Sequence, residues 1–390
     1  MDFPLPHRPG VPLDAGHLRL LRERPLVPAA VAGRGALLVT RHADVRTVLA
    51  DGRFSREAWH GGTLFARTPA SLALVTSDPP VHTRRRRAVQ ARFTARRAEA
   101  DRPRMAALAG RLLDGMAADG PPADLLARFA TPFPYAVICD MLGVPAGDLG
   151  LLLPWVSAMM SAGHYPDTEV KAAHEGMHGY FAELVAARRT LPGDDLLTEL
   201  VHGSDLSDEE IVVFGSGLLM AGGETTSTFL GSCVLDLVTR PGLAARLRDA
   251  PALVPSAVEE YLRWVWFAGT GGQPHVLLAD AELAGTPLGR GDVVVPLTDA
   301  ANRDPAAFPA ADEFDPARSP NPHLGFGHGR HMCLGAHHAR AQLQIALTAL
   351  LRRFDDLALG VDPARLAWRE GMFMRGVWQL PLTWSEGRPR

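Results

Sequence analysis

A glycine-rich loop around one cysteine constrains this chain more than any other stretch. In "HLGFGHGRHMCLGAHHAR", residues 323–340, glycines alternate before Cys333 and one more glycine follows it. A helical pattern of apolar residues then continues to about Phe354. The cysteine therefore lies where a loop becomes a helix, and the unpaired N–H groups and the dipole of a first helical turn favour the thiolate form there. A thiolate at such a place can act as a metal ligand.

Two kinds of metal site use ligands of this type. Structural zinc sites usually pair two ligand arms, and the chain has no second cysteine arm of that kind. Haem takes a single cysteine thiolate, because the porphyrin supplies the remaining ligands. The spacing therefore favours haem, with a catalytic zinc site as the alternative. The residues of zinc-ligand type in this stretch are His328, His331, Cys333, His337 and His338.

Composition excludes several other classes of protein. Hydrophobic residues make up 47% and charged residues 21% of the chain, which fits a globular protein and not a disordered one. The net charge of −3 predicts no general affinity for nucleic acid. Three scattered cysteines form no disulfide framework, and neither a secretion signal nor a window of roughly 18 apolar residues is present. The sequence therefore predicts a cytoplasmic protein that does not span a membrane.

The order of helical and strand-like segments predicts the fold class. Helical periodicity dominates from about residue 80 to 264 and again over residues 334–354, whereas short β-rich runs cluster near both ends. There is no internal repeat or long linker. We therefore expect a mainly α fold with a small β-rich region, in a single domain over residues 1–390.

The cysteine loop resembles a motif of a known family. "FGHGRHMCLG", residues 326–335, matches every fixed position of the haem-ligand loop F-G-x-G-x-H-x-C-x-G of the cytochrome P-450 family. The resemblance implies the family's triangular, mostly helical fold, with haem b held between the helix of Thr225 and the helix after Cys333. It implies that Cys333 binds the iron and that Phe326, His331 and Gly335 lie at the haem. The glycines would let the loop approach the flat porphyrin.

A second stretch, "LLMAGGETTSTFLGS", resembles the oxygen-binding groove A-G-x-[DE]-T-T of the same family. Its two central glycines each cost a helix about 1 kcal/mol relative to alanine, which indicates that something approaches the backbone closely. Taken alone, the pattern more often marks a small-residue face that packs against another helix. Thr225 lies four residues after Ala221, so its hydroxyl can bind that carbonyl. The resemblance implies that Ala221 and Gly222 lie at the cofactor, that Thr225 steadies dioxygen and that Glu224 helps to relay protons.

A third stretch, "SDPPVHTRRRRAVQARF", resembles the family's D-P-P-x-H-T-R-x-R-R pattern. On a helix, His82 and Arg86 share one face at i and i+4. The resemblance implies that these two residues, together with His331, bind the haem propionates. Bacterial members commonly carry a further propionate-binding arginine in a P-R-x-A strand, but here "QPHVLLADAEL" places His275 at that position. We therefore expect His275 to bind a propionate in place of that arginine.

Two later stretches resemble the family's structural core. Glu260 and Arg263 in "AVEEYLRW" have the E-x-x-R spacing, and "FDPAR" supplies Arg318. In isolation such a pair is a surface salt bridge of under about 1 kcal/mol. The resemblance implies instead a structural ion network of the three residues, with no part in the chemistry.

The resemblance implies a haem-thiolate monooxygenase that uses O2 to hydroxylate or epoxidise a hydrophobic small molecule, in the tailoring of a bacterial natural product. The alternatives are oxidative coupling or another atypical oxidation, and a non-catalytic haem-binding protein. Because the chain lacks a dinucleotide fingerprint, electrons from NAD(P)H would arrive through a ferredoxin reductase and a ferredoxin. The expected docking residues are Arg84, Arg85, Arg87, Arg330, His337 and Arg340. The expected substrate-pocket residues include Met159, Met160, Trp266, Phe267, Phe373 and Met374, with residues 61–75.

Overall fold

The computed structural model describes residues 2–3, 10–13, 18–19, 24–59, 74–268 and 272–385. The chain forms two compact units, each built from two separate stretches: Met1–Arg87 with Glu259–Leu334, and Ala88–Val258 with Gly335–Arg390. We call the first the sheet unit and the second the helical unit. The single domain over residues 1–390 stays a prediction.

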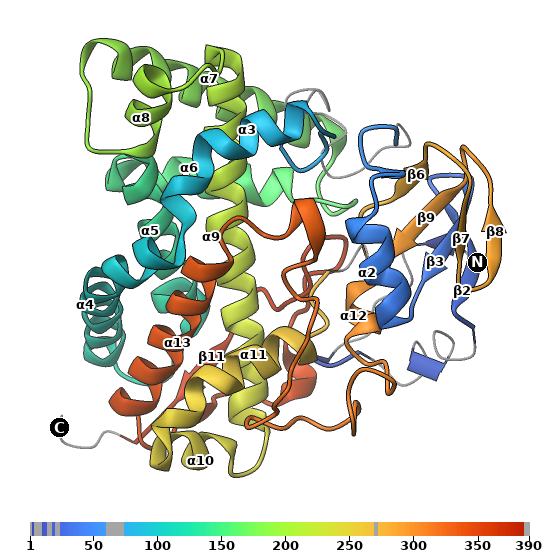
Figure 1. Ribbon diagram of the computed structural model, residues 1–390. Helices are drawn as coiled ribbons and strands as arrows, with labels where there is room; N and C mark the ends of the chain where they lie inside the picture. The colour runs from blue at the N-terminus through green and yellow to red at the C-terminus, as the bar shows by residue number, and fades with distance from the viewer. Residues whose placement is uncertain are drawn as a thin grey trace. The chain divides into compact units, whose positions relative to one another are not determined.

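The sheet unit is built on short strands. They are β1 (Asp2–Phe3), β2 (Leu26–Val31), β3 (Arg34–Val39), β4 (Phe54–Ser55), β6 (His275–Leu277), β7 (Ala281–Leu283), β8 (Thr286–Leu288) and β9 (Val293–Pro296). Six of them form one sheet in the order β1-β2-β3-β9-β6-β4, and β7 pairs with β8 (Figure 1). The helical segments of this unit are α2 (His42–Ala50), α12 (Thr298–Ala301) and η5 (Gly329–His331).

Both faces of the central strands β3 and β9 are buried. On β3, Leu38 belongs to one apolar cluster and Val39 to another, and Val295 and Val294 of β9 divide in the same way. Successive side chains of a strand point to opposite faces, so both faces of these strands are covered. This explains why "ALLV" in β3 and "VVV" in β9 are continuous apolar runs.

Long helices make up the helical unit. They are α4 (Ala95–Asp119), α5 (Pro132–Leu142), α6 (Leu149–Met159), α7 (Asp167–Thr190), α8 (Leu196–Gly203), α9 (Asp208–Thr239), α10 (Leu243–Asp249) and α13 (Ala336–Arg353). Short segments complete it: η1 (Gln90–Phe93), β5 (Ala123–Asp124), η2 (Leu126–Ala130), η3 (Ala146–Asp148), η4 (Pro251–Leu253), β10 (Ala358–Leu359), η6 (Pro363–Arg365) and β11 (Pro381–Thr383). Helices α3 (Val81–Val89) and α11 (Val254–Trp264) contain residues of both units.

The long helix α9 carries the "AGGETT" stretch, and it is the yellow-green helix of Figure 1. Ser207 begins it with a capping box, in which its hydroxyl accepts from the Glu210 N–H and the Glu210 carboxylate accepts from the Ser207 N–H. Three acidic residues in the first turn add a favourable interaction with the helix dipole. Helix α9 packs against α5 and α7, and α13 packs against α4.

The predicted fold class, mainly α with a small β-rich region, is confirmed. The sequence of residues 365–384 predicts two or three strands, but this stretch contains β11 and two isolated bridges, between Trp368 and Val377 and between Ser161 and Met372. Gly371 interrupts the pattern there with a φ of 69°. Within the ranges that the structure describes, no helix is long and apolar enough to cross a membrane.

Candidate functional site

The loop of Cys333 is held by its own backbone. The N–H of Cys333 donates to the carbonyl of Phe326 at 2.8 Å, and η5 forms the turn before it. Helix α13 begins three residues after the cysteine, at Ala336, as the loop-to-helix pattern predicts. Cys333 is exposed, whereas Cys139 and Cys233 are buried. Burial raises the pKa of Cys139 to about 12, so of these three sulfurs Cys333 is the one placed to bind a ligand.

The backbone of the protein itself requires two of the loop glycines. Gly327 and Gly329 have φ values of 70° and 69°, a conformation that a residue with a side chain rarely adopts. A Cβ on Gly329 would also collide with the carbonyl oxygen of Leu49. The protein's own backbone therefore requires these two glycines, independently of any porphyrin. At Gly335, by contrast, a Cβ would meet nothing within 4 Å, so room remains beside this predicted haem contact.

Basic side chains gather in the sheet unit around the propionate-binding residues that the sequence predicts. The rings of His82 and His331 lie 4.3 Å apart, edge to face. Both imidazoles have a buried Nε2 with no hydrogen-bond partner among the described residues. We call this group the basic cluster. Its members are Arg56, His82, Arg86, His275, Arg330 and His331.

Burial and mutual repulsion in the basic cluster favour an anionic ligand. Burial, followed by the charges of Arg86, Arg330 and Arg56, lowers the pKa of His82 to about 4. Burial and the neighbouring basic groups also lower the pKa of His331 far below its usual range. Buried charges are ordinarily paired, and unpartnered buried polar atoms are rare. A ligand with carboxylate groups would fit both observations, and haem carries two of them.

Arg56 belongs to the basic cluster although no sequence motif pointed to it. Its Nε lies 3.2 Å from Nε2 of His275, and Nη1 donates to the carbonyl of Val75 at 3.3 Å. His275 and Arg56 are 219 residues apart in the chain, so no local spacing could link them. Pairing of β4 with β6 brings them together, because Ser55 lies opposite Val276 in an antiparallel register.

The threonine of α9 makes the bond that its spacing predicts. The Thr225 hydroxyl donates to the Ala221 carbonyl at 2.5 Å, while the helix stays continuous from Asp208 to Thr239. Ala221 is exposed, although most of the helix around it is buried, and Gly222 and Thr225 are partly exposed. This short face of α9 is therefore open to a ligand.

The two central glycines of α9 meet helix α5. A Cβ on Gly223 would lie 2.5 Å from Cε1 of Tyr135, and one on Gly222 would lie 3.0 Å from Cγ1 of Ile138. Close helix packing therefore explains both glycines, which is the alternative that the sequence left open. The predicted contact of Gly222 with the cofactor stays a prediction.

Glu224 lies in a buried polar network inside the helical unit. Its carboxylate accepts a hydrogen bond from the Tyr135 hydroxyl at 3.0 Å and pairs with Arg369 at 2.5 Å. Arg369 also donates to the Thr228 hydroxyl at 2.7 Å and lies 4.9 Å over the ring of Trp378. Burial, and then the Glu224 carboxylate, raise the pKa of Tyr135 well above its usual range, so the phenol keeps its proton. The Thr228 hydroxyl also donates to the Glu224 carboxylate at 3.4 Å, and the sequence missed all three partners of Glu224.

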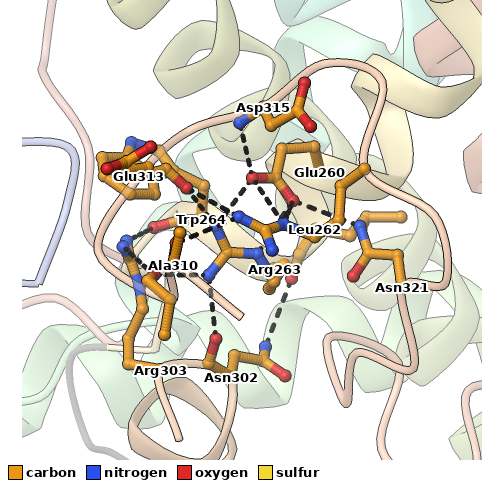
Figure 2. A network of polar contacts seen from close by, with 12 residues as sticks. Glu260, Leu262, Arg263, Trp264, Asn302, Arg303, Ala310, Glu313, Asp315 and Asn321 are labelled. Carbon is orange, nitrogen blue, oxygen red and sulfur yellow. Dashed lines mark hydrogen bonds and ion pairs between the residues drawn. The ribbon is translucent and has the colours of Figure 1, made fainter. Parts of the chain in front are cut away.

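The predicted structural ion network is confirmed in the sheet unit, where Figure 2 shows it. Glu260 and Arg263 are fully buried and form a two-pronged ion pair at 2.7 and 2.8 Å. Arg318 adds a second cation at 3.0 Å from Glu260. The sequence missed Arg303, which lies 3.7 Å over the Trp264 ring and whose pKa burial lowers to about 9.

The expected docking residues are not all accessible. Arg85 is buried, and its guanidinium donates to the Ser77 hydroxyl at 2.7 Å, so its assignment to a docking surface was wrong. Arg87 is exposed, and Arg84 and Arg330 are partly exposed. In the helical unit, His337 is exposed and Arg340 partly exposed.

The expected pocket residues divide into buried and partly exposed side chains. Residues 61–73 lie outside the described residues. Phe267 and Phe373 are partly exposed. The others are buried core: Met159, Met160, Trp266 and Met374. Nowhere in the described ranges do three His, Cys, Asp or Glu side chains gather so that they could hold a metal ion.

Comparison with known proteins gives relatives along almost the whole chain. The cytochrome P-450 family model matches residues 252–366. Mycinamicin IV hydroxylase/epoxidase of Micromonospora griseorubida is 44% identical, with 90% of each chain covered. Nocardicin C N-oxygenase of Nocardia uniformis subsp. tsuyamanensis is 39% identical, with 98% of each chain covered. The crystal structure of HinD with NMFT and NO is similar with a TM-score of 0.93 and 41% identity, over 98% of this chain and 99% of that one.

The fold and these relatives define a haem-dependent oxygenase of bacterial type. The chain belongs to the cytochrome P-450 family, and it is a monooxygenase whose family uses haem iron and O2.

Proposed function

We propose that this monooxygenase binds haem b through Cys333 and through the basic cluster. The observation that carries the proposal is the position of the exposed thiol two residues after His331, in the unit that contains the basic cluster, where the Nε2 atoms of His82 and His331 have no hydrogen-bond partner among the described residues. His82, Arg86 and His331 would bind the propionates, since charge-assisted hydrogen bonds hold carboxylates well. Phe326 would steady the ligand loop through its carbonyl bond to the Cys333 N–H at 2.8 Å.

When bound, haem supplies the oxygen activation and oxygen transfer that the protein alone cannot perform. The chain's part is binding, orientation and proton movement. The Thr225 hydroxyl donates its hydrogen to the Ala221 carbonyl. Its lone pairs can therefore accept a hydrogen bond from a donor at the open face of α9. Glu224 would hold or release a proton at its carboxylate, where the Tyr135 and Thr228 hydroxyls can exchange protons with it.

A hydrophobic bacterial natural product is the substrate class that we propose, with hydroxylation or epoxidation as the reaction. The mycinamicin relative named as a hydroxylase/epoxidase supports this assignment. Oxidative coupling is the second candidate, because one relative of known structure is described as a putative thioether synthase involved in a griseoviridin tailoring step and another as having biaryl coupling reactivity.

Electrons from NAD(P)H would reach the enzyme in the cytoplasm through a ferredoxin reductase and a ferredoxin. The exposed Arg87 and the partly exposed Arg84 and Arg330 could attract an acidic partner. We expect Arg87→Glu to slow reduction by ferredoxin at low salt, with the difference shrinking as salt screens the charges. Stopped-flow reduction rates at two salt concentrations measure this, and equal rates at low salt would rule out docking at Arg87.

The carbon monoxide difference spectrum of the reduced protein tests the proposal directly. The wild type should show the red-shifted band of a thiolate ligand, and Cys333→Ala should lose that band together with product formation. Cys139→Ala is the matched control, because that thiol is buried with a pKa raised to about 12. A normal thiolate band in Cys333→Ala would contradict the assignment of Cys333 as the iron ligand.

A further inference from the structure

We infer that Arg56 is a haem-propionate ligand of this enzyme, and that His275 holds Arg56 in place instead of binding the propionate itself. The inference rests on the proposed haem binding. In other bacterial members, an arginine in a strand has this cationic role. In this chain, the role would fall to an arginine in a different segment.

The protonation of His275 follows from its two hydrogen bonds. Its Nδ1 lies 2.8 Å from the carbonyl oxygen of Gln273, which can only accept, so Nδ1 carries the hydrogen. Its Nε2 lies 3.2 Å from Nε of Arg56, which can only donate, so Nε2 is the bare acceptor. Burial and the Arg56 charge lower the pKa of His275 well below its usual value, in agreement with a neutral ring. A neutral ring whose N–H is already committed has none left for a carboxylate.

Arg56, in contrast, has N–H donors that its contacts with His275 and Val75 do not use. A guanidinium has five N–H bonds, and the contacts to His275 and Val75 use one on Nε and one on Nη1. Nη2 and the second hydrogen of Nη1 have no acceptor among the described residues. Within the same ranges, Arg56 has no carboxylate at ion-pair distance, although Asp78 acts on it from farther away. Burial lowers the pKa of Arg56 to about 10, which still leaves it charged at neutral pH.

The position of Arg56 matches that of the residue it would replace. Strands β4 and β6 pair with Phe54 opposite Leu277 and Ser55 opposite Val276, so the next step of the register brings Arg56 to His275. The charge of Arg56 also acts on His82 and His331, the predicted propionate ligands. Arg56, directly after β4, thus brings its charge beside His275 of β6, the position at which the family resemblance implies a propionate-binding arginine.

Loss of haem from the full-chain holoenzyme tests this role without relying on activity. Transfer of haem to an excess of apomyoglobin gives the rate. Arg56→Met should release haem about ten- to a hundredfold faster than wild type, the range expected when a hydrogen bond to a charged group is removed. Arg53→Met is the matched control, because that exposed arginine pairs with Asp51 and should leave the rate unchanged.

A rescue distinguishes a ligand from a merely structural residue. Adding His275→Arg to Arg56→Met returns an arginine to the family's usual position and should restore slow release. Arg56→Gln, which keeps a donor for the Val75 carbonyl but no charge, should release haem as fast as Arg56→Met. Wild-type release rates in Arg56→Met or Arg56→Gln, or no rescue in the double variant, would overturn the inference. A wild-type protein without haem or its thiolate band would instead defeat the proposed function.

Discussion

The Glu260→Gln variant is expected to lose about 3–5 kcal/mol of unfolding free energy, the typical cost of removing one partner from a buried ion pair. The Glu260 carboxylate accepts from Arg263, from Arg318 and from the Asp315 N–H at 2.9 Å. Without that charge, the guanidinium of the buried Arg263 has no ion pair with a carboxylate among the described residues. Arg303, close by and also buried, adds further repulsion.

Urea unfolding of the wild type and the variant measures this cost. Glu259→Gln makes the same chemical change one residue earlier, where the carboxylate pairs with His323 at 2.9 Å and its side chain is 29% exposed. A partly exposed pair is worth about 1 kcal/mol or less, so this control should unfold close to wild type. Equal unfolding midpoints for Glu260→Gln and Glu259→Gln would show that the buried network does not stabilise the fold.

Arg369→Met is expected to cost a similar 3–5 kcal/mol or so and to impair oxygen transfer as well. The change leaves the Glu224 carboxylate buried beside Tyr135 without its cation. A carboxylate in that state favours the protonated form, because burial disfavours the charge. Glu224 would then relay protons to the site at an altered rate, so less product should form for each NAD(P)H consumed.

The double variant Arg369→Met/Glu224→Gln separates the two effects. Replacing both partners of a buried pair is often nearly neutral for stability, so most of the lost unfolding free energy should return. Product yield per NAD(P)H should stay low, because the double variant has no carboxylate at position 224. Thr225→Ser, which keeps the hydroxyl, serves as the control for yield. A double variant that is as unstable as Arg369→Met would contradict the ion-pair explanation.

The sequence predicted the features that depend on neighbours along the chain. The Thr225 to Ala221 hydrogen bond joins residues four apart, and the Glu260 to Arg263 pair joins residues three apart, so helical geometry alone sets both. The long apolar runs predicted buried strands and helices, because these elements also depend on residues that are neighbours along the chain. Some sequence patterns fit two explanations. Gly223 and Gly329 suggested a cofactor, and the structure accounts for them through Tyr135 and the Leu49 carbonyl.

By itself, the sequence determined the mostly helical class and the loop of Cys333, because helical period, capping and turn glycines act over a few residues. Only the tertiary structure decided which charges meet. Arg56 reaches His275 across 219 residues, and Arg369 reaches Thr228 across 141. It buried Arg85, which the sequence had placed at the surface. Such pairings depend on strand register and helix packing, so no spacing along the chain encodes them. They form because an unpaired charge is costly once it is buried.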